Sequence, residues 1–167
     1  GARAVFNHPR NIDDARIQKL AAAGGVVQIN SYSDYLVETP AIPARDTAMR
    51  ALGTKYGPLR TLAGERLKAY MGERHAIEAQ YPLPHATMDD LMAHIPHALK
   101  LVGVEHVGIG LDWDGGGGVT GMEDVADLPE ISTRLLAAGY TEADLTKIWS
   151  GNVLRVMRAV EAKAAEL

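Results

Sequence analysis

The sequence contains no cysteine, and this absence excludes disulfide bonds and thiolate chemistry within its 167 residues while leaving the cellular compartment open. It has no excess of basic residues either, because 17 lysines and arginines face 21 aspartates and glutamates. We therefore expect no nucleic-acid partner. No apolar run approaches the roughly 20 residues that cross a bilayer, so we expect no membrane span. What the chain does have is 47% hydrophobic residues, enough for the core of one domain.

Hydrophobic periodicity and helix-end signals predict more helix than strand. The expected order is a helix from Asn11 to Ala23, a strand over Val26–Asn30, a break at Pro40 and Pro43, a charged helix over 61–81, a helix opened by Thr87 with Asp90, a strand over Val104–Leu111, and helices opened at Asp127 and Thr141. This alternation is typical of a parallel α/β fold. Two strands cannot complete such a sheet, because parallel strands are covered on both faces and a closed barrel takes roughly 250 residues.

The most informative stretch is the second strand and the turn after it. Two carboxylates, Asp112 and Asp114, lie at the C-terminal tip of this strand, directly before the four glycines 115–118. Ligands and catalytic groups in α/β proteins gather at such strand ends. Strand alternation turns successive side chains to opposite faces, so we expect Asp112 to carry function and Asp114 to bond the backbone of the glycine turn.

Several further strings stand in a specific order and spacing along the chain: Pro9–Asp14, Val107–Gly118, Gly121–Val125, Asp127–Pro129, Leu135–Tyr140 and Gly151–Val156. Together they resemble the zinc-dependent membrane dipeptidase (renal dipeptidase) family, over nearly the whole chain. Residues around 38–86 are the least family-like and look like the helical insertion of some bacterial members. The resemblance implies that residues 1–167 form the C-terminal part of a single TIM (β/α)8 barrel domain of the metal-dependent hydrolase type.

The resemblance also implies an activity. The family hydrolyses the peptide bond of dipeptides with a water activated by two zinc ions, so we expect a zinc-dependent metallodipeptidase that forms a homodimer. The family's zinc ligands all match positions upstream of Gly1, and none of the six histidines here matches one. The missing N-terminal half of the barrel is therefore expected to supply the ligands, and no metal ligand is assigned within this chain.

Three residues of this chain match substrate-binding positions of the family. The arginine that matches Arg10 holds the C-terminal carboxylate of the dipeptide, and a planar guanidinium suits that role because it grips a carboxylate with two parallel hydrogen bonds. The aspartate that matches Asp112 contacts the amino end of the substrate and is placed to transfer a proton during cleavage. The tyrosine that matches Tyr35 lines the substrate pocket. Taken without the resemblance, Arg10 is an ordinary solvated arginine beside a helix start.

Two other interpretations of the residues remain open, and the first is a metal site on a helix. Asp90, His94 and His97 stand at positions i, i+4 and i+7, which places them on one helical face where they could ligate a metal. Pro96 disturbs that geometry.

The second alternative is a calcium loop. Counting Asp112 as its first position puts Asp114 at the third, Gly117 at the sixth and Glu123 at the twelfth. The fifth position is a glycine rather than an oxygen donor, and a strand precedes the loop where a helix is expected. The alternative to a dipeptidase is thus a calcium-binding or structural module without hydrolytic activity.

Overall fold

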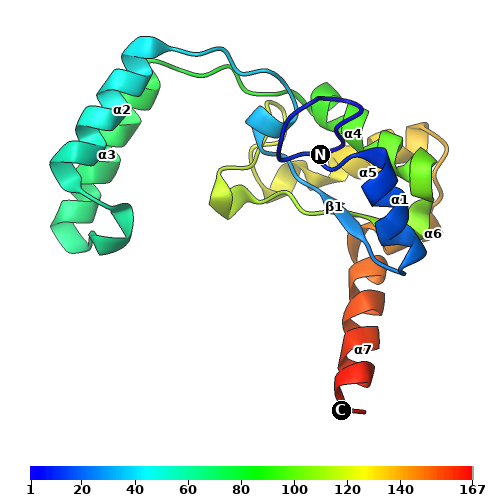
Figure 1. Cartoon of the computed structure of the whole chain (residues 1–167). Coiled ribbons are helices and arrows are strands. Elements are labelled where there is room, and N and C mark those ends of the chain that lie inside the picture. Colours follow the sequence, from blue (N-terminus) through cyan, green and yellow to red (C-terminus); the bar gives the residue numbers. More distant parts are fainter. Residues whose placement is uncertain (167) are drawn as a thin grey trace. The chain divides into compact units, whose positions relative to one another are not determined.

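The computed structural model describes residues 1–166, which form helices and one short parallel sheet (Figure 1). The strands are β1 (Val27–Ile29) and β2 (Val107–Ile109), and the helices are α1 (Asp14–Ala22), α2 (Pro43–Tyr56), α3 (Gly64–Gln80), α4 (Met88–Val102), α5 (Leu128–Ala137), α6 (Glu142–Thr146) and α7 (Asn152–Ala164). The chain divides into two compact units. One unit combines residues 1–38 with the chain from residue 85 onward, and the other comprises residues 39–84.

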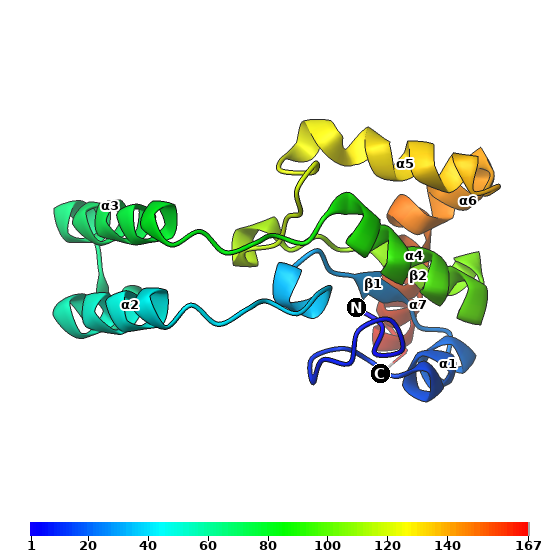
Figure 2. The ribbon, with the colours of Figure 1, turned by 90° about the horizontal axis from the view of Figure 1, so that it is seen from above.

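Strands β1 and β2 form the centre of the larger unit. They run parallel, with Val27 opposite Val107 and Ile29 opposite Ile109. Helix α4 packs along this sheet between α1 and α5 (Figure 2). The core around the sheet also contains Leu91 and Ile95 of α4, Ile131 and Leu135 of α5, and Ile148, all fully or almost fully buried. Because the register aligns the strands residue for residue, the segments that follow them begin at the same edge.

The N-terminal ends of both strands are held by the last helix. The buried Asn152 donates from Nδ2 to the carbonyls of Val104 and Val107, at 2.6 and 2.8 Å. Arg155, one turn further, donates to the carbonyl of Gly24 before β1 at 2.8 Å. A buried amide that satisfies two carbonyls in this way fixes the chain entering the sheet. The Gly151–Val156 string is thus structural, and the opposite strand ends are left for function.

Helix-end signals in the sequence predict three helix starts correctly and one incorrectly. Asp127 is the N-cap of α5, as predicted. Capping boxes begin α4 at Thr87 and α6 at Thr141, as predicted. The N-cap of α1, however, is Asp13 and not Asn11. The reason is that the Asn11 side chain is buried and donates to the carbonyl of Tyr35 at 2.7 Å, so it is unavailable to a helix end.

Residues 39–84 form a helical hairpin of their own. Helices α2 and α3 lie side by side in Figures 1 and 2, around a small core of Leu52, Tyr56 and Leu62. The sequence predicts a chain break at Pro43, whereas Pro43 begins α2, because the fixed φ of proline and its missing N–H suit the first turn of a helix. Both helices lie within residues 38–86, and the origin of this segment as a family insertion stays a prediction.

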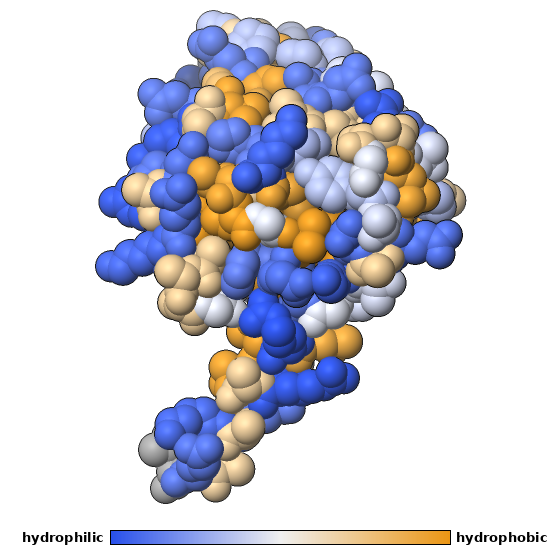
Figure 3. Space-filling view, turned by 90° about the vertical axis from the view of Figure 1, so that its right-hand side faces the viewer, coloured by the Kyte–Doolittle hydropathy of each residue, from blue (hydrophilic) through white to orange (hydrophobic). Residues whose placement is uncertain are grey.

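Helix α7 begins against β2 and then extends away from the rest of its unit (Figure 1). Its side chains Leu154, Met157 and Val160 are 41%, 51% and 63% exposed, and Figure 3 shows apolar surface where the helix leaves the unit. Within residues 1–166, no helix combines the length and the apolar character needed to cross a membrane.

Candidate functional site

The C-terminal ends of β1 and β2 bring two polar side chains together. Asn30 directly follows β1, and Asp112 lies three residues beyond the end of β2. Asn30 donates from Nδ2 to Oδ2 of Asp112 at 3.0 Å. The next residue of the first segment, Ser31, is fully buried and donates from Oγ to the carbonyl of Leu111 at 2.6 Å. The two post-strand segments are therefore joined side by side, with Asp112 exposed at their surface.

The glycine run folds back against Asp112. The N–H groups of Gly115 and Gly117 both donate to the Asp112 carbonyl, at 3.0 and 2.8 Å. A Cβ atom at Gly117 would lie 1.9 Å from the carbonyl oxygen of Leu111, which no side chain can tolerate. Asp112 itself adopts φ 61° and ψ 41°, the left-handed region that aspartate enters more readily than most residues. The turn that holds the Asp112 carboxylate in place therefore requires glycine at position 117.

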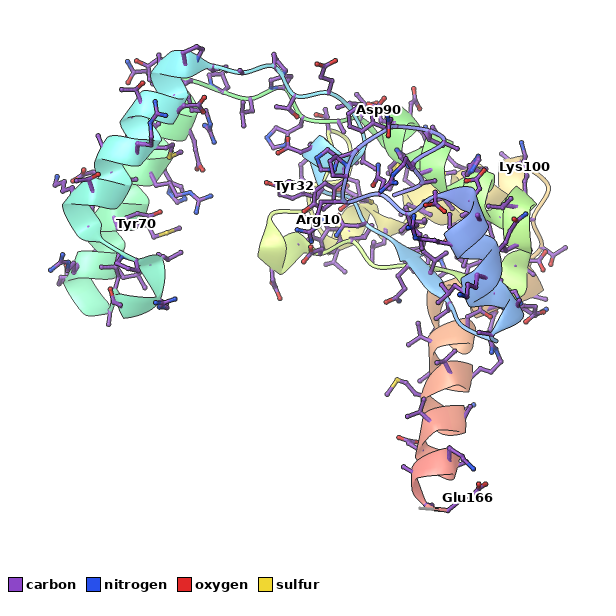
Figure 4. All side chains as sticks on the ribbon, viewed as in Figure 1. Arg10, Tyr32, Tyr70, Asp90, Lys100 and Glu166 are labelled. Atoms are coloured by element: carbon purple, nitrogen blue, oxygen red, sulfur yellow. The ribbon has the colours of Figure 1, made fainter. Side chains whose placement is uncertain are left out.

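Arg10 lies over an aromatic cluster beside this turn. Its guanidinium carbon is 5.4 Å from the ring centre of Tyr35, a cation–π distance. The ring of Tyr35 also contacts those of His8 and Tyr32, with centroids 5.1 and 4.8 Å apart. Figure 4 labels Arg10 and Tyr32 in the same region of the unit. Arg10 is exposed, and no ion pair within the described chain involves its guanidinium.

The structure therefore links the three predicted site residues. Arg10 contacts Tyr35 directly, and the ring of Tyr35 packs at a tilt against that of Tyr32. The Tyr32 N–H donates to Oδ1 of Asn30 at 2.6 Å, and Asn30 in turn binds Asp112. The individual roles of Arg10, Tyr35 and Asp112 stay predictions. What the network offers is a cation and a carboxylate that are both held against residues 30–35, an arrangement that suits a small molecule with opposite charges at its two ends.

Sequence reasoning assigns no role to Asn30 or His8, although both belong to this network. The signal for Asn30 is its place as the last residue of the first predicted strand, which resembles the place of Asp112 directly after the second. His8 precedes Arg10 by two residues, and its Nδ1 accepts from the Arg10 backbone N–H at 3.2 Å. No sequence pattern indicates that contact, since it depends on the local turn.

The prediction that strand alternation separates Asp112 from Asp114 is wrong. Strand β2 ends at Ile109, so neither aspartate lies on a strand and alternation does not apply to them. The backbone of Asp112 adopts the left-handed conformation, whereas Asp114 is exposed and lies within the 3₁₀ helix Trp113–Gly115. The difference between them rests instead on contacts, because Asp112 binds Asn30 while the Asp114 carboxylate has no hydrogen-bond partner in the described residues.

The metal site suggested on α4 is not formed. The carboxylate of Asp90 accepts the N–H and hydroxyl of Thr87 in the helix cap, both at 2.7 Å. His94 is fully buried, with Nδ1 accepting the Ala2 N–H at 2.9 Å. His97 instead pairs through Nε2 with the Asp14 carboxylate at 2.9 Å. The three side chains are engaged with three different partners, so their helical spacing does not make a ligand set.

The calcium loop is not formed either. The Glu123 carboxylate, its twelfth position, accepts the N–H of Gly121 at 3.0 Å, while Asp112 is held by Asn30. Across residues 1–166, no three His, Cys, Asp or Glu side chains gather as a metal-binding group. A strand precedes the loop, so the helix–loop–helix frame of such sites is missing there as well.

The burial of His94 predicts a pH-dependent stability. Burial disfavours the charged imidazolium and lowers the pKa of His94 to about 4, from 6.5 in an exposed histidine. Between these values the unfolded chain binds a proton that the folded chain does not, so folding weakens as the pH falls. We expect the free-energy cost of His94→Asn, measured by urea unfolding beside the parent, to be smaller at pH 4.5 than at pH 7 by roughly 2–3 kcal/mol. A cost independent of pH would contradict this.

Comparison with known proteins identifies the family. The sequence model of the family described as Membrane dipeptidase (Peptidase family M19) matches residues 1–167. The chain belongs to this family. The resemblance seen in the sequence strings is thereby confirmed.

Relatives named as dipeptidases match almost the whole chain. Dipeptidase aclJ of Aspergillus oryzae is 41% identical over 99% of this chain and 30% of its own length. An uncharacterized dipeptidase of Schizosaccharomyces pombe is 29% identical, again over 99% of this chain and 30% of its own length. The chain thus spans about a third of the length of these curated relatives.

Solved structures of peptidases share the fold of the chain. The probable dipeptidase PvdM from Pseudomonas aeruginosa matches with a TM-score of 0.64 and 30% identity, over 92% of this chain and 42% of its own. A metallo peptidase from Rhodobacter sphaeroides, solved with a phosphinate mimic of L-Ala-D-Ala, matches in fold with a TM-score of 0.58 at 24% identity, covering 90% of this chain and 32% of its own. The mixed α/β, mostly helical architecture of this chain is therefore part of the fold seen in these solved structures.

Proposed function

We propose that this chain is the C-terminal part of a zinc-dependent dipeptidase. The observation that carries the proposal is the network at the strand ends, in which Arg10, Tyr35 and Asp112 are joined through Tyr32 and Asn30. A dipeptide has a carboxylate at one end and an ammonium at the other, only two residues apart. A site that holds a cation and a carboxylate against the same segment, residues 30–35, matches that substrate class.

We also propose that the two-stranded sheet is part of a TIM (β/α)8 barrel. Three features support it: both strands are edges of the described sheet, a parallel sheet is normally covered on both faces, and the apolar residues of α7 are exposed. The curated relatives are also about three times as long as this chain. In such a barrel the site described here lies at the C-terminal face, where catalytic groups of this fold are found.

Within this proposal, each residue has a definable role. Arg10 binds the free α-carboxylate of the dipeptide with two parallel hydrogen bonds, and the ring of Tyr35 supports the guanidinium from one side. Asp112 binds the amino end and accepts or returns a proton during cleavage. Binding both ends of the substrate favours dipeptides over longer chains, because the two charged termini of a longer peptide lie further apart.

The described residues form no ligand set for a metal, so we derive no step through zinc held by this chain. The two zinc ions, which supply the activation of the attacking water, would be bound by the upstream half of the barrel. We call this chain together with that upstream half the complete enzyme. Its assembly as a homodimer is part of the same proposal.

We expect residues 1–167 alone to bind no stoichiometric zinc and to hydrolyse no dipeptide, because the ligands lie in the missing half and the sheet edges are open. Metal analysis after dialysis against zinc, together with an assay of amino-acid release, checks both statements. The complete enzyme serves as the control and should cleave dipeptides that have both ends free. One or two tightly held zinc ions on the isolated chain would be incompatible with the proposal, as would a complete enzyme inert toward dipeptides.

A further inference from the structure

Asn30 contacts the carboxylate to which the proposed function gives a catalytic role. It is the first residue after β1, and its Nδ2 donates to Oδ2 of Asp112 at 3.0 Å. The two residues are 82 positions apart in the sequence, so their contact depends on the parallel register of β1 and β2. This hydrogen bond therefore ties Asp112 to the sheet rather than to its own loop.

The amide of Asn30 is fixed in the orientation that this contact needs. Its Oδ1 accepts the backbone N–H of Tyr32 at 2.6 Å. Only the oxygen of an amide accepts a hydrogen bond from an N–H, so the NH₂ group must face the other way. It faces the Asp112 carboxylate, and turning the amide over would break both hydrogen bonds at once.

Gly115 closes the other side of the same carboxylate. A Cβ atom at Gly115 would lie 2.5 Å from Oδ1 and 3.0 Å from Oδ2 of Asp112, closer than side-chain carbons approach. The carboxylate therefore occupies a slot between a hydrogen-bond donor and a residue without a side chain. Such a slot restricts the orientation of Asp112 although the residue itself is exposed.

We propose that Asn30 is a positioning residue, which holds the Asp112 carboxylate in the orientation that meets the amino end of a dipeptide. The inference rests on the proposed function, because Asn30 acts only through Asp112. A neutral amide donor suits this role, since it orients the carboxylate without adding a charge that would repel or compete for the substrate's ammonium group. Holding a reacting group in its productive geometry before substrate arrives is a large part of catalysis by orientation.

The test is the Asn30→Asp substitution in the complete enzyme. Aspartate has the size of asparagine and keeps an oxygen that can accept the Tyr32 N–H, but it replaces the donor facing Asp112 by a second carboxylate. We expect kcat for a dipeptide to fall by about 10- to 100-fold, the usual effect of losing a hydrogen bond to a charged group, with zinc content and thermal midpoint unchanged. Gln18→Glu, an exposed position on α1, adds the same charge and should leave kcat at the parental level.

A double-mutant cycle with Asp112→Asn separates positioning from a structural role. Once Asp112 has lost its charge, its new amide can donate to the carboxylate at position 30, so the hydrogen bond is restored with reversed polarity. Asn30→Asp should then cost less than about 3-fold in kcat, because residues that act as a unit are not additive. An equal loss in both backgrounds would overturn the positioning role alone, and would mean that Asn30 only shapes its loop.

Two further outcomes are decisive. Asp112→Asn at parental turnover would overturn the proposed function, and this inference with it.

If Asn30→Asp fails to fold, Gly115→Ala takes its place. Gly115 is not among the glycines with a positive φ, so alanine fits its backbone, and the added methyl group would displace Oδ1 of Asp112. We expect kcat to fall by at least about 10-fold, since small misplacements of a reacting group are costly. A parental kcat for Gly115→Ala would overturn the inference.

Discussion

Asp112→Asn in the complete enzyme is expected to lower kcat by about 100-fold or more, the usual contribution of a positioned proton-transfer group. Asparagine keeps the size of aspartate and most of its hydrogen bonding, but it is uncharged and cannot accept the proton. The exposed position of Asp112 and its contact with Asn30 leave no role for it in the core, so folding should be normal. Steady-state kinetics, with zinc content and thermal midpoint measured on the same preparation, check the prediction.

Asp114→Asn is the matched control for that experiment. It makes the same chemical change two residues further on, within the same loop, at an exposed carboxylate that has no hydrogen-bond partner in the part of the chain described. We expect a much smaller loss of kcat. Near-parental turnover of Asp112→Asn, or equal losses for the two variants, would contradict the catalytic role of Asp112.

Local signals explain which parts of the fold could be predicted. Capping boxes at Thr87 and Thr141 depend only on residues three positions apart, and the structure confirms both. The two strands are predicted in place but too long, since β1 and β2 have three residues each. Their outer residues have strand-like composition, yet a strand extends only as far as its neighbour pairs with it.

The site could be predicted only in part, because its contacts link distant segments. That Asp112 follows a strand is visible in the sequence, and the glycines after it indicate a sharp turn. The hydrogen bond from Asn30 requires the register that puts Ile29 opposite Ile109, and no local pattern specifies a register between strands so far apart in the sequence. The expected alternation of strand side chains likewise does not hold at Asp112, because its backbone is left-handed.

Burial determines which contacts the two histidines on α4 make. Like the strand register, burial depends on the tertiary fold. The spacing of Asp90, His94 and His97 places them near one face, which is all that a sequence pattern can indicate. In the folded unit His94 lies in the core and binds the backbone of Ala2, while His97 reaches Asp14 of α1. A helical spacing of ligand-type residues therefore predicts a metal site only where the shared face is open.

Arg10→Ala in the complete enzyme is expected to raise KM for dipeptides by about 10- to 100-fold, because it removes a charge-assisted bidentate contact worth roughly 1.5–3 kcal/mol. Arg10 is exposed and contacts the ring of Tyr35, so its removal should leave the fold and the zinc content intact. Arg10→Lys keeps the charge but loses the planar fork, and an intermediate KM is expected for it.

A dipeptide with an amidated C-terminus tests whether the higher KM of Arg10→Ala comes from a lost contact with the substrate carboxylate. An amide carries no charge for the guanidinium to bind, so the parent should cleave the amidated substrate poorly, and Arg10→Ala should change that rate little. The two effects would then fail to add, which is the signature of two groups that act on each other. Equal losses on free and amidated dipeptides would mean that Arg10 stabilises the aromatic cluster around Tyr35 and does not bind the substrate.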